Sequence, residues 1–231
     1  KVIPGNTGYS QYYYGVQLVN SFNGVPVEAY ADQLVGTKIT GQNSGVTAYV
    51  DKILSSTDSE RGNLTLYINY LSSNTTNNAT QTFSDGESLI CDTVLSSGLL
   101  GNTTIEAGAP FANTLPATAA VTGSSFQIQN GIYFIRGQFV NVATETLILD
   151  QYNASPSYRI GLLVTEEIIT ADIDETLNDN SQGFNNYAAP GADRLKISAR
   201  LSKKPNIDFQ DDDFVELATV ADGVLRSKVK N

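Results

Sequence analysis

The chain has 231 residues, a formal net charge of -10, a single cysteine, and no histidine, methionine or tryptophan. Without histidine there is no Ser-His-Asp or Cys-His triad and no histidine-ligated metal site. One cysteine excludes an internal disulfide and a cysteine-rich metal cluster. The acidic balance argues against binding to a nucleic acid backbone, which needs clustered lysine and arginine. No apolar run reaches the ~18 residues of a membrane-spanning helix, so we expect no nucleic acid partner, no membrane insertion, no cofactor and no metal.

The composition also favours one fold class. Charged residues make up 16% of the chain, which is below the ~25% typical of globular domains, and serine, threonine, asparagine and glycine are abundant in their place. Turns between short strands need such residues, so we predict an all-β protein. Because methionine is absent and the chain starts with Lys1, we expect the sequence to be a piece of a longer protein.

Residues 1–35 are predicted to form an aromatic strand and its return, packed on the rest of the protein. Tyr12, Tyr13 and Tyr14 are consecutive, and side chains alternate along a strand, so Tyr12 and Tyr14 face one way and Tyr13 the other. We expect one face to pack on the core or on another subunit, because tyrosine combines an apolar ring with a polar tip. Contact with a glycan or with another protein is an alternative for the same residues.

Residues 36–95 are predicted to form a small β-barrel or β-sandwich module. Its clearest strand places Leu66, Ile68 and Tyr70 on one face, as a period of two requires. Cys91 lies in an apolar run without a basic neighbour, which is typical of a buried cysteine that packs as a small hydrophobic residue.

Residues 96–125 are rich in serine, glycine, threonine and alanine, and this composition predicts a linker. Residues 126–231 are predicted to form a larger antiparallel domain that resembles a β-sandwich. The elements expected there are hairpins around Gly137 and at Asp222-Gly223, a favoured turn dipeptide, and strands at 158–164 and 195–201.

A long loop is predicted at 178–191. In and just after it, four residues are expected to have a structural role: Tyr187, Pro190, Gly191 and Arg194. Proline presets its own φ, and glycine permits positive φ. Arg194 is expected to pair with an acid such as Glu166 or Glu167. The alternative is that the loop touches a neighbouring subunit.

Carboxylates are the catalytic groups that remain. A glycosidase needs two of them, roughly 5–10 Å apart. Two runs contain enough acids: Asp211, Asp212 and Asp213, and Asp172, Asp174 and Glu175. Consecutive aspartates repel each other, so the favoured interpretation of 211–213 is a solvated turn before the strand at Phe214. The run from Asp172 has the alternating oxygen donors that Ca²⁺ prefers but lacks the glycine of an EF-hand loop. We predict neither catalytic residues nor a metal site in these runs.

One stretch resembles a small β module of structural proteins of tailed phages. It consists of Gly41–Val50, which contains Ser44-Gly45-Val46-Thr47-Ala48, followed by Phe83–Glu87, which contains Asp85-Gly86-Glu87.

A second, longer set resembles an uncharacterised domain of tail and baseplate proteins of cyanophages and related contractile-tailed phages. It consists of Gly131–Val140, Tyr158–Gly161, Val164–Glu166 and Asn185–Lys196. This resemblance covers most of 126–231, and Tyr187–Leu195 is its most specific part.

The resemblance implies a non-enzymatic structural protein of the phage tail, associated with the baseplate or at the base of a tail fibre. Such proteins are commonly homotrimers or parts of multi-copy rings. The expected partners are therefore copies of the chain and neighbouring tail proteins, and the expected location is the virion. The family has no catalytic residues that carry over. Two alternatives are a host receptor- or glycan-binding module of a tail fibre, and a carboxylate-dependent glycan depolymerase.

Overall fold

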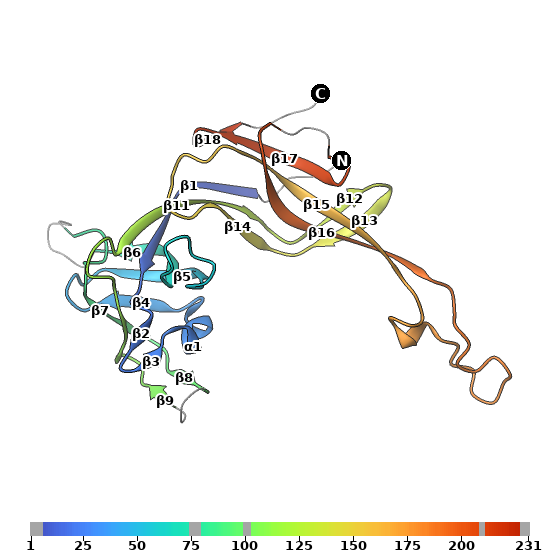
Figure 1. Ribbon diagram of the computed structural model, residues 1–231, viewed down its shortest axis with the longest axis horizontal. Coiled ribbons are helices and arrows are strands. Elements are labelled where there is room, and N and C mark those ends of the chain that lie inside the picture. The colour runs from blue at the N-terminus through green and yellow to red at the C-terminus, as the bar shows by residue number, and fades with distance from the viewer. Residues whose placement is uncertain (1–6, 74–79, 99–102, 208–210, 227–231) are drawn as a thin grey trace. The chain divides into compact units, whose positions relative to one another are not determined.

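A computed structural model describes residues 7–73, 80–98, 103–207 and 211–226. These residues form eighteen strands and three short helical segments, so the predicted all-β fold is confirmed (Figure 1). The helical segments are α1 (Glu28–Ala31), η1 (Asp32–Leu34) and η2 (Glu175–Leu177). None of the helices in the described part of the chain is long and apolar enough to span a membrane.

The chain divides into two compact units. The first, here called the core unit, contains Ser10–Ser125 and Ile148–Ser155, and the second, the arm unit, contains Lys1–Tyr9, Phe126–Leu147 and Pro156–Asn231. This division differs from the predicted one, because one boundary falls inside the aromatic strand at 1–35. Segments of the two units also alternate along the chain. A prediction that divides the sequence into consecutive domains cannot find this arrangement.

The largest sheet has eight strands in the order β10-β7-β4-β5-β6-β1-β11-β14. Their bounds are Pro110–Asn113 for β10, Ser88–Cys91 for β7, Lys38–Gly41 for β4, Thr47–Leu54 for β5, Thr65–Ser72 for β6, Thr7–Gln17 for β1, Ala120–Ile128 for β11 and Glu145–Asp150 for β14. Two small hairpins accompany it: β2 (Ser21–Phe22) with β3 (Val25–Pro26), and β8 (Leu95–Ser97) with β9 (Thr103–Ile105).

The hydrophobic core of the core unit lies on one face of this sheet. Leu66 and Ile68 are buried in it and Tyr70 packs against it, so the predicted shared face of these three residues is confirmed. Cys91 is also buried in this core as a free thiol.

The linker predicted at 96–125 is wrong. That segment contributes strands β9, β10 and β11, and Phe111 and Ala112 of β10 are fully buried. Small polar residues fill the turns between these short strands, so the composition resembles a linker although the backbone is paired.

The arm unit contains a four-stranded antiparallel sheet in the order β16-β15-β17-β18 and a separate hairpin, β12-β13. The bounds are Arg194–Pro205 for β16, Tyr158–Ile169 for β15, Phe214–Ala221 for β17, Val224–Arg226 for β18, Gly131–Ile135 for β12 and Gln138–Val142 for β13. Both predicted hairpins are present. Positive φ occurs at both central residues of each turn, 49° and 83° at Arg136-Gly137 and 50° and 77° at Asp222-Gly223, as tight hairpin turns require.

The hairpin of β15 and β16 extends beyond the rest of its sheet (Figure 1). The two strands pair over their full length, from Tyr158↔Pro205 to Ile169↔Arg194. In contrast, β17 pairs with β15 only as far as Leu163↔Phe214. The distal half of the hairpin is therefore a two-stranded ribbon, and the loop at 170–193, here called the tip loop, closes it.

Candidate functional site

The β12-β13 hairpin of the arm unit is apolar on both faces. Its inner face is buried and consists of Tyr133, Ile135, Val140 and Val142. Its outer face consists of Ile132, Phe134 and Phe139, which are 73%, 45% and 79% exposed. The register pairs Phe134 with Phe139, and their ring centroids lie 5.3 Å apart. Contiguous exposed apolar side chains of this size mark interaction surfaces.

A second exposed apolar pair lies on the distal ribbon. Ile168 is directly opposite Leu195 in the register of β15 and β16, and these side chains are 62% and 60% exposed. The same face of the ribbon is buried further back, at Leu162 and Leu201. Apolar residues thus continue along this face of the ribbon beyond the point where the face is buried. A shallow hollow of about 420 Å³ lies between β13 and β16, and its lining includes Phe139 and Leu195.

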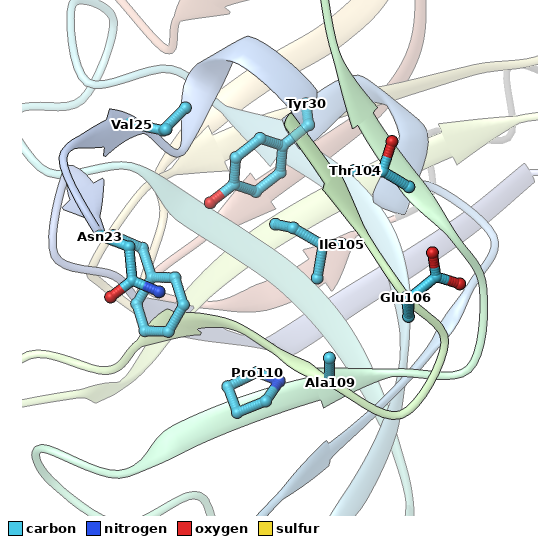
Figure 2. Close-up of a pocket in the computed structure, with 9 residues that line it drawn as sticks. Asn23, Val25, Tyr30, Thr104, Ile105, Glu106, Ala109 and Pro110 are labelled. Carbon is cyan, nitrogen blue, oxygen red and sulfur yellow. The ribbon is translucent and has the colours of Figure 1, made fainter. Parts of the chain in front are cut away.

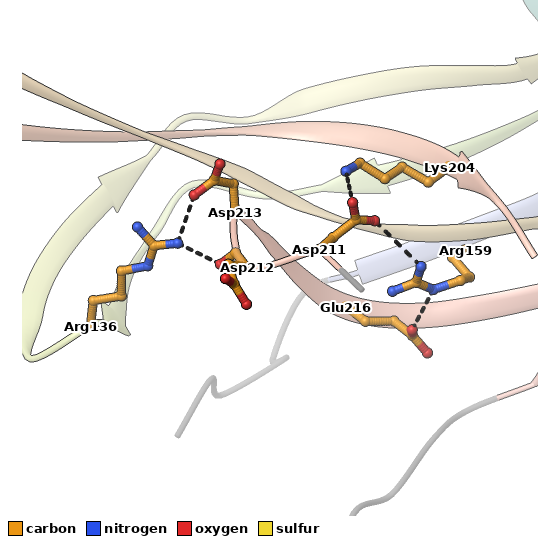
Figure 3. Close-up of polar contacts among 7 residues, drawn as sticks. All are labelled: Arg136, Arg159, Lys204, Asp211, Asp212, Asp213 and Glu216. Atoms are coloured by element: carbon orange, nitrogen blue, oxygen red, sulfur yellow. Dashed lines mark hydrogen bonds and ion pairs between the residues drawn. The ribbon is translucent and has the colours of Figure 1, made fainter. Parts of the chain in front are cut away.

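Of the aspartates at 211–213, Asp212 and Asp213 lie exposed in a turn before β17, as predicted, whereas the Asp211 side chain is only 15% exposed. The Asp211 carboxylate lies 2.7 Å from the Lys204 ammonium and 3.5 Å from the Arg159 guanidinium. Arg159 also donates to Glu216 at 2.8 Å, and its side chain is only 5% exposed (Figure 3). Basic residues on β15 and β16 draw the loop inward, a pairing that distant sequence positions do not reveal.

Arg136, in the turn of the β12-β13 hairpin, connects three segments of the arm unit. Its guanidinium donates to Glu166 of β15 at 2.7 Å and to Asp213 at 2.8 Å, and also to the Asp212 carbonyl (Figure 3). The hydrogen bonds to Glu166 and Asp213 raise the pKa of the Arg136 guanidinium. These carboxylates are therefore engaged by cations, whereas a glycosidase pair must face a substrate.

The acids at 172–175 form no metal site in the described part of the chain. There, no group of three or more carboxylate or cysteine side chains could hold a metal ion. Asp174 instead accepts hydrogen bonds from the Thr176 hydroxyl at 2.6 Å and the Thr176 amide at 3.0 Å. These bonds lower the pKa of the Asp174 carboxyl, and they form a local turn at the start of η2.

The tip loop closes on itself through the residues singled out in the sequence. Pro190 forms a bridge with Asn178, and the Gly191 amide donates to the Leu177 carbonyl at 3.0 Å. A Cβ atom on Gly191 would lie 2.1 Å from that carbonyl oxygen, so glycine is required there. Tyr187 is exposed at the far end of the loop.

The predicted pairing of Arg194 with Glu166 or Glu167 is wrong. Arg194 lies opposite Ile169 in the strand register, and its guanidinium donates to the Ala192 carbonyl at 3.4 Å. Glu166 pairs with Arg136, and Glu167 lies 3.8 Å from Lys196.

Comparison with protein families gives one match, to a domain of unknown function named DUF4815, over residues 102–231. The match covers more than half of the chain. The chain belongs to the DUF4815 family. Searches of curated proteins and of solved structures found no match. The DUF4815 segment contains the outer face of β12-β13, the distal ribbon and the tip loop, and also strands β10 and β11.

The aromatic row at Tyr12, Tyr13 and Tyr14 lies outside the DUF4815 segment, in the core unit. Tyr13 is buried and stacks on Tyr67 with ring centroids 4.6 Å apart, and its hydroxyl donates to Asp51. Burial and this hydrogen bond raise the pKa of Tyr13. Tyr12 and Tyr14 are exposed on the opposite side of the strand, as the alternation predicts.

The core unit also has an open pocket of about 470 Å³. Val25, Tyr30, Ile105 and Pro110 supply its apolar walls, and Asn23 and Glu106 lie exposed at its rim (Figure 2). The Tyr30 hydroxyl is occupied by a hydrogen bond to the Phe111 carbonyl at 2.6 Å. The size and the mixture of apolar walls with a few polar groups fit a small ligand.

Sequence reasoning missed both the outer face of β12-β13 and this pocket. The signal for the outer face is the unbroken apolar run Ile132-Tyr133-Phe134-Ile135, since a strand without alternation is apolar on both faces. The pocket has no comparable signal, because its walls come from β3, α1 and the segment around β9 and β10.

Proposed function

We propose that the chain is a structural protein of a bacteriophage tail, associated with the baseplate or the base of a tail fibre. It acts by assembly rather than by catalysis, as a homotrimer that also binds neighbouring tail proteins. The observation that carries this proposal is the exposed outer face of β12-β13, formed by Ile132, Phe134 and Phe139.

Burial of this face in an assembly is energetically favourable. Moving a phenylalanine or isoleucine side chain out of water contributes about 1.5–3 kcal/mol. Phe139 and Ile132 are mostly exposed in the single chain, so most of that gain is available to a partner. Apolar side chains that remain exposed after folding are typical of surfaces that close on a symmetric copy or a neighbour.

The location of the phage-like stretches supports the same proposal. Gly131–Val140, which resembles phage tail proteins, contains the whole outer face of the hairpin. Asn185–Lys196, the other long stretch of that resemblance, contains Leu195 of the distal pair. The ion pairs of Asp211 and Glu216 favour assembly over a glycan depolymerase, because these carboxylates are neutralised by Arg159 and Lys204.

The proposal is tested in the phage that encodes the chain. Particles carrying Ile132→Ser and Phe139→Ser are expected to lack complete tails in electron micrographs of the lysate, because the assembly surface has become polar. Val35→Ser and Tyr49→Ser are the control, since these apolar residues are also exposed, at 50% and 46%, but belong to the core unit. Normal tails in the hairpin variant, with correct folding shown by circular dichroism, would rule the proposal out.

The pocket of the core unit favours a second candidate function, which is binding of a host glycan. Sugars pack on apolar and aromatic walls and form hydrogen bonds with polar rims such as Asn23 and Glu106. A glycan array should show saturable binding that Glu106→Ala weakens when combined with Thr104→Ala, a further residue that lines the pocket, whereas the exposed control Glu60→Ala does not weaken it. Absence of binding to any glycan of the host surface would exclude this function.

A further inference from the structure

Basic residues gather on one strand of the arm unit. β16 contains five of them and no acid. Side chains alternate along a strand, so Arg194, Lys196 and Arg200 lie on one face, opposite to the face of Leu195. All three are exposed. We call these three residues the basic row. Lys196 has a counterion in Glu167 at 3.8 Å, in a pair more than half exposed on both sides, and such pairs are weak.

The tip loop has the opposite charge. Residues 170–193 contain five acids and no base: Asp172, Asp174, Glu175, Asp179 and Asp193. Asp172, Glu175 and Asp193 are exposed. Asp179 accepts a hydrogen bond from the Ser181 amide at 2.8 Å, and hydrogen bonding with Ser181 lowers the pKa of its carboxyl.

The tip loop and two of the three basic-row residues, Arg194 and Lys196, lie beyond the part of β15 that β17 pairs, and Arg200 lies at its end, opposite Leu163. β17 stops pairing with β15 at Leu163, so the ribbon between Val164 and Ile169 has only β16 beside it in its sheet. An isolated two-stranded hairpin is marginally stable in water. The face of the ribbon that carries the basic row is exposed, so the ribbon gains stability when another surface covers that face.

We infer that the acidic tip loop of one copy of this chain docks against the basic row of a second copy. The inference rests on the proposed assembly function and names a contact within it. Each copy carries both surfaces, so the contact can be made reciprocally or can repeat around a ring. A free polyanion is a poorer occupant, because it meets a net charge of -10 and the five acids of the adjoining tip. The tip loop of a second copy carries five acids and closes the far end of an extended hairpin (Figure 1).

The test uses the full 231-residue chain and charge reversal on each surface separately. The row variant is Arg194→Glu with Arg200→Glu, and the tip variant is Asp172→Lys with Glu175→Lys. Neither changes Lys196, Asp174 or Asp179, whose contacts belong to the fold. The matched controls are Lys38→Glu with Arg226→Glu and Asp32→Lys with Glu60→Lys, which change the net charge equally outside the two surfaces.

Sedimentation over a range of concentrations at low salt should show self-association of the unaltered chain. Each single-surface variant should associate at least about tenfold more weakly, and the two controls should behave like the unaltered chain. An equimolar mixture of row and tip variants should associate again, because the unaltered basic row of the tip variant meets the unaltered acidic tip of the row variant.

Four outcomes would overturn the inference. One is an unaltered chain that stays monomeric at every concentration. Another is a mixture of the two variants that fails to associate, as expected if the basic row only guards an edge strand against pairing. The third is binding of heparin that the row variant loses, without any self-association. Association that survives both reversals but is lost in Ile132→Ser with Phe139→Ser would contradict this contact and leave the proposed assembly function standing.

Discussion

Glu87 and Ser44 meet in the interior of the core unit, where the Glu87 carboxylate accepts hydrogen bonds from the Ser44 amide and the Ser44 hydroxyl, both at 2.9 Å. The same carboxylate accepts from the Asn43 amide at 3.0 Å and the Ser84 amide at 2.6 Å. Glu87 is fully buried. It therefore joins the loop at Asn43-Ser44 to the loop at Ser84, and it satisfies backbone amides that would otherwise be buried without partners.

Replacing Glu87 with glutamine should destabilise the core unit. The amide side chain has one acceptor oxygen and brings an NH₂ group toward backbone amides that are themselves donors. We expect a loss of about 2–4 kcal/mol in the free energy of unfolding, measured by urea denaturation. Glu106→Gln, at an exposed position, should change it by less than about 0.5 kcal/mol. Equal stabilities of the two variants would contradict the role assigned to Glu87.

Gly161 on β15 is predicted to tolerate no side chain. A Cβ atom there would lie 2.3 Å from the Val215 carbonyl oxygen and 2.8 Å from the Phe214 ring, at the point where the register of β15 and β17 shifts. Gly161→Ala should cost about 2–3 kcal/mol of stability, because backbone atoms must move. Gly98→Ala is the control, since nothing lies within 4 Å of its Cβ position. A melting temperature of Gly161→Ala equal to that of the control would show that the strands separate freely.

Arg159→Ala should destabilise the arm unit. Arg159 is buried and pairs with Glu216 and Asp211, which are 17% and 15% exposed, so its removal leaves carboxylates poorly solvated. We expect the free energy of unfolding to fall by about 2–4 kcal/mol, as measured by urea denaturation of the full chain. Arg200→Ala, which removes an exposed guanidinium from the same sheet, should change stability by less than about 0.5 kcal/mol. A comparable loss of stability in both variants would mean that the buried ion pairs of Arg159 contribute no more to stability than an exposed arginine does.

Stability should fall in alkaline solution because of buried tyrosines. Burial raises the pKa of Tyr30 to about 12. The pKa of Tyr70 is also raised to about 12, and burial is the largest cause. In the unfolded chain both phenols ionise near pH 10. Below that pH they are neutral in both states, so their contribution is fully present. It is lost as the pH rises from about 10 through 12, because only the unfolded chain releases the protons.

Two measurements check this pH dependence. The free energy of unfolding should decrease by a few kcal/mol between about pH 10 and 12, and tyrosinate absorbance should rise in parallel with unfolding. Tyr30→Phe should be less stable at neutral pH, because the bond to the Phe111 carbonyl is lost, but its stability should depend less steeply on pH. An equally steep dependence would show that Tyr30 is not among the groups responsible.

The hairpins were the elements best predicted from sequence. The turns at Arg136-Gly137 and Asp222-Gly223 depend on local residues that accept positive φ, and the face shared by Leu66 and Ile68 follows from alternation alone. These features depend only on neighbouring residues, so they can be predicted from a single sequence.

The remaining features depend on which strands meet. Asp211 was predicted to be solvated because Arg159 and Lys204 lie far away in the sequence, and pairing of β15, β16 and β17 brings them together. The predicted partner of Arg194 is wrong because the sequence of one strand does not determine its register with another. In the structure, Ile169 lies opposite Arg194. Leu195 begins a run of alternating apolar residues, which predicts a half-buried strand. It is exposed because it lies opposite Ile168, beyond the part of β15 that β17 pairs.

The most direct test of the central claim is a cryo-EM reconstruction of the phage particle that we propose contains this chain. We predict that Ile132, Phe134 and Phe139 lie within contact distance of another protein chain in the tail, either a copy or a neighbour. A map in which the chain lies outside the tail, or in which the outer face of β12-β13 is bathed in solvent in the assembled particle, would contradict the claim.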